Sequence, residues 1–251
     1  MTRCSMERGR PPAGRPFDRR PRSTSSKTHA EFPRMTHSAT ALLFDFDLTL
    51  VDSTEAIQFC AQSAIADMNL TVPCATRVRE SIGLTLHDTF RFLTGIEDAT
   101  LAETYAAYYV SHADRVMVNM TNVYPSAESL LRELHHRNVP VGIVSTKFRR
   151  RIEAILSKVS LRHCVRTIIG GEDVLRHKPD PEGILKALAA MNVAANEALY
   201  VGDHLIDAQA AHAAGTRFVG AVTGQLTSEA WARIGCKSVK HSIAELVAFV
   251  P

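Results

Sequence analysis

The sequence has no long hydrophobic segment, few aromatic residues and few cysteines. No uncharged apolar stretch reaches the roughly 18 residues that a membrane-spanning helix needs, so we expect no association with a membrane. The five cysteines are odd in number and show no C-x-x-C spacing, which argues against a disulfide framework or a zinc site and favours reduced thiols. We therefore expect a cytoplasmic protein.

Apart from these gaps, the composition is that of an ordinary globular protein. Hydrophobic residues make up 45% of the chain and charged residues 22%, as in typical soluble domains. A length of 251 residues is enough for one substantial domain or for a core with a smaller inserted one.

Basic charge is concentrated at the start of the chain. Residues 1–34 hold nine Lys or Arg against three Asp or Glu, a charge of +6, so the remainder carries −3 within the net +3. Their Pro, Gly, Ser and Arg content predicts a disordered leader over residues 1–38. We interpret it as an inert extension before a start at Met35, the alternatives being a nucleic-acid-binding tail and a transit peptide. Because the rest is acidic, we expect no nucleic-acid partner.

The most informative stretch is ALLFDFDLTLVDS, residues 41–53. Its first four residues are a continuous apolar run, typical of a strand buried on both faces of a parallel sheet. Asp45 and Asp47 follow on one side of the extended chain, where their repulsion calls for a divalent cation or a shared proton. One carboxylate could act as a nucleophile and the other transfer protons. The alternative is a strand leading into a helix that Asp52 or Ser53 caps.

Residues 54–122 show helical patterns and no convincing strand. Apolar residues at i, i+3 and i+4 predict an amphipathic helix over Thr54–Met68. Further helical patterns cover Thr76–Ile82, Thr85–Leu93 and Leu101–Val118. This is more helix than one crossover between parallel strands requires, so we expect an inserted helical domain.

Strands and helices alternate from Pro125 onward. The expected strands are Val139–Val144, Val165–Ile169 and Ala198–Val201, and further short elements cover Arg217–Val222 and Ile243–Val250. The expected helices begin at Pro125, Phe148, Pro181 and Leu205, and Gly215 should end the last of them. The pattern predicts an α/β fold, a doubly wound, Rossmann-like parallel sheet with an inserted α-helical domain. The core would comprise residues 39–53 and 123–251, and the insert residues 54–122.

Polar side chains follow the expected strands, where ligands of such sheets bind. They are the hydroxyls of Ser145 and Thr146, the ammonium of Lys178 and the carboxylates of Asp203 and Asp207. Hydroxyls and an ammonium suit phosphate, and carboxylates suit Mg²⁺. Each residue alone could instead be a helix cap, a first-turn charge or a solvated loop lysine. Their joint occurrence at the strand ends of one sheet favours a common site.

Four segments in this order resemble the haloacid dehalogenase (HAD) superfamily, specifically its phosphoglycolate phosphatase-like branch with a helical cap. They are DFDLTLVDS (45–53), VGIVSTK (141–147), HKPDP (177–181) and VGDHLIDAQAAHAAG (201–215). The resemblance extends over about residues 40–250.

The resemblance implies a Mg²⁺-dependent phosphatase that hydrolyses a small phosphorylated metabolite through an aspartyl-phosphate. Asp45 would be the nucleophile and Asp47 the proton donor and acceptor. The implied metal ligands are Asp45, the backbone carbonyl of Asp47, Asp203 and, directly or through water, Asp207. The implied phosphate ligands are Ser145, Lys178 and the amide of Thr146. The helical insert would be a mobile cap domain, with hinges near residues 52–54 and 119–124.

The sequence departs from the family pattern at three places. Leu48 replaces a frequent glycine, His204 a frequent serine, and the second segment reads Ser-Thr in place of the commoner Thr-Asn. The catalytic groups remain, but the substrate is left open. By analogy 2-phosphoglycolate leads, with Thr85, His87 and Arg91 as candidate selecting residues.

Other activities are compatible with the same four segments, and some of them fit less well. A pyrophosphatase or nucleotidase and a sugar-phosphate mutase share them. A dehalogenase would not need Asp47, and a non-catalytic binding protein would not need Asp45 or Asp47. A homodimer through exposed apolar faces of the cap domain is a further expectation.

Overall fold

The computed structural model describes residues 38–224, 226–236 and 238–251. The predictions for the basic leader fall on residues 1–37, which lie outside the described residues. No helix among the described residues is long and apolar enough to cross a membrane.

A six-stranded parallel sheet in the order β5-β4-β1-β6-β7-β8 forms the centre of the protein. Its strands are β1 (Ala41–Phe44), β4 (Val141–Val144), β5 (Thr167–Ile169), β6 (Ala198–Gly202), β7 (Arg217–Ala221) and β8 (Val239–Lys240). The chain builds outward from β1 to β5 and then crosses to β6 on the other side of β1. Strand order therefore reverses between β1 and β6, the position at which open α/β sheets bind ligands.

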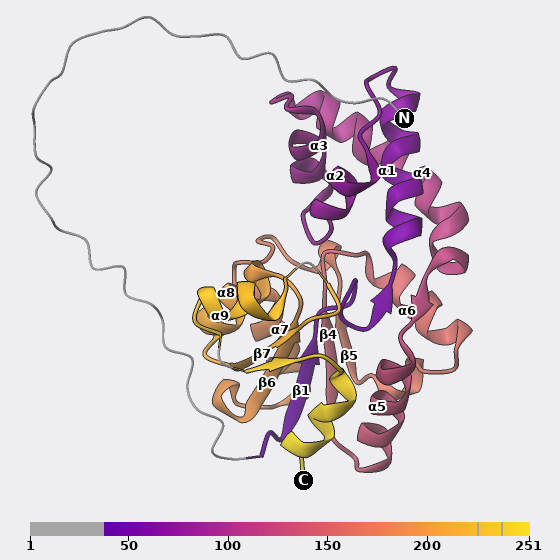
Figure 1. Ribbon diagram of the computed structural model, residues 1–251. Coiled ribbons are helices and arrows are strands. Elements are labelled where there is room, and N and C mark those ends of the chain that lie inside the picture. Colours follow the sequence, from indigo (N-terminus) through magenta and orange to yellow (C-terminus); the bar gives the residue numbers. More distant parts are fainter. Residues whose placement is uncertain (1–37, 225, 237) are drawn as a thin grey trace, which may run out of the picture.

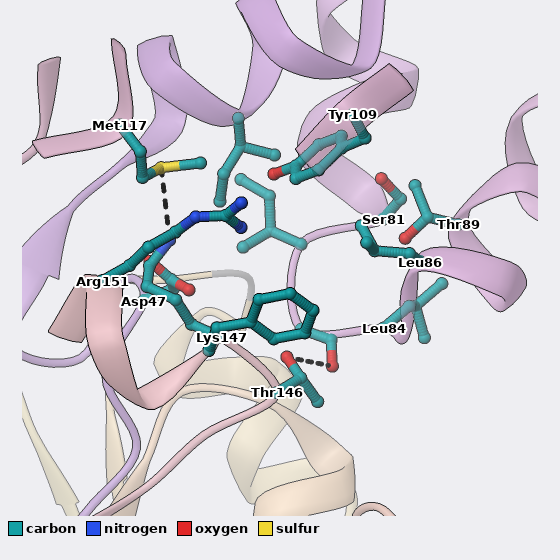
Figure 2. Close-up of a pocket in the computed structure, with 14 residues that line it drawn as sticks. Asp47, Ser81, Leu84, Leu86, Thr89, Tyr109, Met117, Thr146, Lys147 and Arg151 are labelled. Atoms are coloured by element: carbon teal, nitrogen blue, oxygen red, sulfur yellow. Dashed lines mark hydrogen bonds and ion pairs between the residues drawn. The ribbon is translucent and has the colours of Figure 1, made fainter. Parts of the chain in front are cut away.

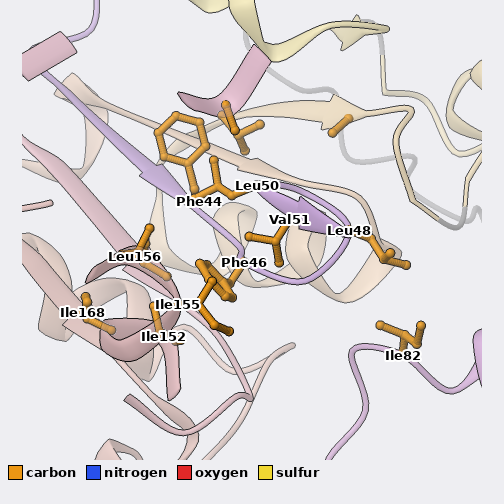
Figure 3. Close-up of a cluster of buried hydrophobic side chains, with 14 of the residues drawn as sticks. Phe44, Phe46, Leu48, Leu50, Val51, Ile82, Ile152, Ile155, Leu156 and Ile168 are labelled. Carbon is orange, nitrogen blue, oxygen red and sulfur yellow. The ribbon is translucent and has the colours of Figure 1, made fainter. Parts of the chain in front are cut away.

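Helices cover both faces of the sheet (Figure 1). One face carries α5 (Pro125–His136), α6 (Arg149–Lys158) and the 3-10 segment η4 (Ile243–Phe249), and the other α7 (Glu182–Met191), α8 (Leu205–Ala214) and α9 (Ser228–Arg233). In β1, Leu42 and Phe44 pack into the first core, shown in part in Figure 3, while Ala41 and Leu43 pack into the second. Burial on both faces explains why β1 is apolar at every position. The predicted doubly wound parallel α/β fold is confirmed.

In the sequence, four helices separate β1 from the other strands of the sheet. They lie at the top of Figure 1. They are α1 (Thr54–Asp67), α2 (Ala75–Glu80), α3 (Leu86–Thr94) and α4 (Ala99–Met120), and α1 packs along α4. Below, this group is called the helical insert. A two-stranded antiparallel ribbon of β2 (Val51–Asp52) and β3 (Asn122–Val123) joins it to the sheet.

Several elements differ from their predicted bounds. The strands predicted from Val139 and Val165 begin two residues later. Pro140 directly precedes the first strand, and a 3-10 turn at Arg162–Cys164 ends shortly before the second. The sequence analysis did not predict β2, β3, α9 or β8. Two-residue strands are too short to show a periodic pattern, and α9 has only six residues.

The loop after β1 contains a leucine in the left-handed backbone region. Leu48 has φ 61° and is fully buried. Its N–H donates to the carbonyl of Val51 at 2.8 Å, and its carbonyl accepts from Thr223 Oγ1 at 2.6 Å. This conformation is strained for a residue with a Cβ, and a glycine would adopt it without strain. Here the buried side chain offsets the strain.

At position 48 we expect a glycine variant to be more stable than an alanine variant, the reverse of the usual order of stability. Leu48→Ala removes a buried side chain at a cost of about 2–5 kcal/mol in the free energy of unfolding and keeps the strain. Leu48→Gly loses the same side chain but relieves the backbone, so we expect it to be more stable than Leu48→Ala by about 0.5–1 kcal/mol. Urea denaturation of both variants measures the difference.

Leu43 provides the matched control, since it is equally buried but lies in the extended strand β1. There the glycine variant should be the less stable of the two by about 0.5–1 kcal/mol. If glycine were worse than alanine at both positions, strain at Leu48 would be excluded.

Candidate active site

The strand ends of the sheet hold the candidate site residues. Asp45 follows β1, Ser145 follows β4 and Asp203 follows β6. The Asp45 N–H donates to the carbonyl of Val201 at 2.8 Å, and the Ser145 N–H donates to that of Ile169 at 3.0 Å. These bonds extend the sheet ladder one residue beyond the strands. The backbone of the site is therefore fixed by the sheet itself.

Three carboxylates meet at the reversal between β1 and β6. Carboxylate oxygens of Asp45, Asp203 and Asp207 lie within 4.8 Å of one another, and all three residues are buried. Burial raises the pKa of Asp45 to about 7, an effect that Lys178 opposes and the charge of Asp207 reinforces. Burial, with the charges of Asp45 and Asp207, also raises the pKa of Asp203 well above its usual range. The cluster thus lacks positive charge, and its hard oxygen donors fit a divalent cation such as Mg²⁺.

Lys178 is the cation that the structure places against this cluster. Its Nζ lies 2.8 Å from Asp45 Oδ1 and 2.6 Å from Asp207 Oδ1, with 5% of the side chain exposed. Burial alone would lower the pKa of Lys178, but the charges of Asp207 and Asp45 raise it well above its usual value. The lysine is therefore fully charged. Tyr200, whose hydroxyl lies 3.3 Å from Asp207 Oδ1, completes this buried network.

Asp203 and Asp207 have different neighbours. Asp203 Oδ1 accepts from Thr49 Oγ1 at 3.1 Å, and Gly224 approaches so closely that any Cβ there would collide with the carboxylate. Asp207 lies in the first turn of α8, where its Oδ2 accepts from the His204 N–H at 3.1 Å. The helix cap is thus His204 and not Asp203. Asp207 stabilises the helix start and binds Lys178 with its other oxygen.

Asp47 faces the helical insert and is not part of the carboxylate cluster. Its Oδ1 accepts from Ser53 Oγ at 2.6 Å and lies 3.2 Å from Lys147 Nζ. Ser53 precedes α1 but does not cap it with its side chain, whereas Asp52 Oδ1 accepts from the Thr54 N–H at 3.0 Å. The two aspartates of the first segment therefore point to different places, one toward the acidic cluster and one toward the insert.

A cavity of about 60 Å³ lies beside Asp47, between the insert and the sheet. Figure 2 shows Asp47, Thr146 and Lys147 on its sheet side, and Ser81, Leu84, Leu86 and Tyr109 on the side of the insert. A molecule in this cavity would contact both parts of the protein.

Ser145 and Thr146 lie beside the cluster but differ in orientation. Ser145 Oγ accepts from the Lys147 N–H at 3.2 Å. Thr146 Oγ1 donates to the carbonyl of Gly83 at 3.4 Å, so its hydroxyl contacts the insert. The structure gathers Asp45, Lys178, Asp203 and Asp207 into one network and leaves the phosphate-binding roles of Ser145 and Thr146 as predictions.

Sequence reasoning considered Ser53 only as a helix cap and did not single out Thr49, Lys147 or Tyr200. All of these except Tyr200 stand inside the segments quoted above. Tyr200 lies within a buried strand and showed no signal of a functional role, because a tyrosine in a strand is ordinary.

Comparison with known proteins gives relatives of two activities. The chain is 30% identical over 220 residues to the pyrophosphatase PpaX of Listeria innocua, covering 86% of this chain and 98% of the relative. It is 32% identical over 187 residues to phosphoglycolate phosphatase 1 of Pseudomonas aeruginosa, covering 70% of this chain and 66% of the relative.

A solved structure described as a haloacid dehalogenase-like hydrolase, from Bacteroides fragilis, matches with a TM-score of 0.80. It shares 36% identity, and the match covers 83% of this chain and 99% of that one. The sequence profile of the haloacid dehalogenase-like hydrolases matches residues 42–221, which include all the residues of the acidic cluster and Lys178. The chain belongs to the haloacid dehalogenase-like hydrolase family.

Proposed function

We propose that the protein is a Mg²⁺-dependent phosphatase that hydrolyses a small phosphomonoester through an aspartyl-phosphate. The observation that carries the proposal is the environment of Asp45. This buried carboxylate has the Lys178 ammonium at 2.8 Å and the carboxylates of Asp203 and Asp207 within 4.8 Å. Membership of a hydrolase family, and relatives named as phosphatases, support the same conclusion.

In the proposed reaction an Asp45 oxygen attacks phosphorus, and the bond from phosphorus to the leaving oxygen breaks. Asp47 gives its proton to that oxygen, so the alcohol leaves neutral. A water molecule then attacks the aspartyl-phosphate while Asp47 accepts a proton from it, which releases phosphate and restores Asp45. The hydrogen bond from Ser53 at 2.6 Å holds Asp47 toward the cavity in which the leaving group would lie.

The transferred phosphoryl group needs positive charge and N–H donors around its oxygens. Lys178 contacts Asp45 directly, so its ammonium would lie beside a group bound to that carboxylate. Ser145 follows the neighbouring strand β4, and the amide of Thr146 comes next. These groups would orient phosphate before any bond changes, and such positioning is a large part of phosphoryl-transfer catalysis.

Mg²⁺ would be held by Asp45 and Asp203, with Asp207 close enough to assist and the Asp47 carbonyl as a further oxygen donor. The donor set fits this ion because three buried carboxylates face a single lysine. When bound, the ion would neutralise negative charge on the carboxylates and the phosphate.

The helical insert would act as a cap that excludes bulk water during the reaction. Polar contacts hold it against α6 in this structure. Arg151 Nη2 lies 2.7 Å from Asp114 Oδ1 on α4, and Lys158 Nζ donates to the carbonyls of Val118 and Asn119 at 3.2 Å. The β2–β3 ribbon overlaps the two segments, residues 52–54 and 119–124, at which we place the hinges.

Pyrophosphate hydrolysis is the second candidate. It is favoured by the PpaX relative, 98% of which is covered by the match. The same nucleophile would act, with phosphate in place of an alcohol as the leaving group.

Phosphate release should depend on Mg²⁺ and on Asp45. We expect purified protein to release phosphate from small phosphomonoesters or pyrophosphate with Mg²⁺ and to lose this activity in EDTA. Asp45→Asn should lower kcat by at least about 10³-fold, since it removes the nucleophile. Asp98→Asn is the matched control, because Asp98 is the exposed N-cap of α4 and asparagine caps equally well. Activity retained in Asp45→Asn would rule out the aspartyl-phosphate route.

Asp203 should destabilise the protein when no metal is present. A folded-state pKa above the usual value means that the folded protein binds the proton more tightly, so stability falls as pH rises from about 4 through that pKa. At pH 8 in EDTA we expect Asp203→Asn to have a Tm several degrees above wild type. About 1 kcal/mol corresponds to 2–4 °C in a protein of this size.

The difference should shrink at pH 5, and Mg²⁺ should raise the Tm of wild type much more than that of Asp203→Asn. Differential scanning calorimetry with Mg²⁺ and with EDTA measures both effects. A wild type that is more stable than Asp203→Asn in EDTA at pH 8 would contradict the uncompensated charge.

A further inference from the structure

The cavity beside Asp47 has two buried cations in its wall. Of the residues that line it, Lys147 and Arg151 are basic and Asp47 alone is acidic, so the lining carries a net positive charge. Its other side chains are neutral, some apolar, such as Ile57 and Leu84, and some with hydroxyl groups, such as Ser81. A buried charge is costly unless another group pairs with it.

Lys147 has more hydrogen-bonding capacity than its neighbours use. Its side chain is 4% exposed, and its Nζ lies 3.2 Å from Asp47 Oδ1 and 3.3 Å from Met117 Sδ. A thioether is a weak acceptor, and an ammonium has three N–H groups. At least one of them therefore has no oxygen acceptor among the described residues.

Arg151 has spare donors on the same wall. Its Nε and Nη2 donate to Asp114 Oδ1 at 3.1 and 2.7 Å, and Nη2 also donates to the carbonyl of Val110 at 3.2 Å. Nη1 makes no hydrogen bond with the part of the chain that the structure describes. Figure 2 shows the guanidinium directed toward the middle of the cavity, between Met117 and Tyr109.

We propose that Lys147 and Arg151 form a subsite for a negative charge on the leaving group. The inference rests on the proposed function, in which Asp47 protonates the leaving oxygen. The remainder of the leaving group would then lie next to Asp47, where the Lys147 ammonium is. The substrate class is a phosphate ester or anhydride whose leaving portion is itself anionic, through a carboxylate or a second phosphate.

The residues of the insert named in the sequence analysis do not line this cavity. Arg91 pairs with Asp88 and Glu97 on the exposed side of α3. His87, which pairs with Glu103 at 2.8 Å, and Thr85 line a second cavity of about 340 Å³. Lys147, the cation that contacts Asp47, comes from the sheet side of the first cavity.

A pair of substrates of similar size, one with a charged and one with a neutral terminal group, tests the proposal. The two esters, 2-phosphoglycolate and 2-hydroxyethyl phosphate, have a carboxylate and a hydroxymethyl group, respectively, at the same position. We expect wild type to prefer the former by about 10–100-fold in kcat/KM, the value of one or two charge-assisted hydrogen bonds. Pyrophosphate in a separate arm tests a second phosphate as the anion.

Lys147→Met removes the ammonium and keeps the length of the side chain. We expect this variant to lose most of the preference, with kcat/KM falling about 10–100-fold for the anionic substrate and much less for the neutral one. Lys158→Met is the matched control, because Lys158, like Lys147, contacts α4 but lies outside the cavity. The control should keep the wild-type preference.

The outcomes separate the subsite from the proposed function. If wild type had equal kcat/KM for 2-phosphoglycolate and 2-hydroxyethyl phosphate and did not hydrolyse pyrophosphate, the subsite would be overturned. The proposed phosphatase activity would remain. An equal loss on both esters in Lys147→Met would overturn the subsite too and show that Lys147 only positions Asp47. Absence of any Asp45-dependent phosphate release would overturn the proposed function and the subsite together.

Discussion

The buried excess of negative charge at Asp45, Asp203 and Asp207 is the interaction on which the rest of the site depends. Three carboxylates within 4.8 Å of one another share one lysine, so the folded chain holds them together against their mutual repulsion. The folded backbone fixes the positions of the three residues. Asp45 is fixed by the sheet ladder, Asp207 by the first turn of α8, and Asp203 by the close approach of Gly224. The hard oxygen donors of such an arrangement suit a divalent cation.

Topology explains why the two aspartates of one short segment can serve different purposes. β1 lies at the centre of the sheet, and the chain leaves it at the reversal of strand order. Asp45 remains at the strand end beside Asp203, whereas two residues later Asp47 already faces the loop that leads to the helical insert. In the proposed reaction, a nucleophile and a proton donor from one short segment would thus lie on the two sides of the transferred group.

Much of this arrangement could be predicted from the sequence, for reasons that differ by residue. β1 was predicted at its observed bounds because a strand buried on both faces is apolar at every position. α8 was as clear, since Gly215 with φ 75° ends it. The gathering of Asp203 and Asp207 with Asp45 followed from their positions after parallel strands. The pairing of Lys147 with Asp47, and of Tyr200 with Asp207, depends on side-chain directions that residue order does not determine. Leu48 stood out in the sequence only as a departure from the family pattern. Its backbone strain could be recognised only from its φ angle in the structure.

The ribbon of β2 and β3 has a consequence for how such proteins diversify. Val51 pairs with Val123 and Asp52 with Asn122, so the chain departs from the sheet and returns to it at neighbouring points. The roughly seventy residues between these two strands form one loop whose ends are held together. Lengthening such a loop adds little to its entropy of closure. Helices in that loop can be lengthened, shortened or exchanged between relatives while the strand order and the acidic cluster stay in place. An insert taken from a relative could therefore be joined at this ribbon without a change in the sheet. In the proposed function, such an exchange would change the surface that contacts the leaving group.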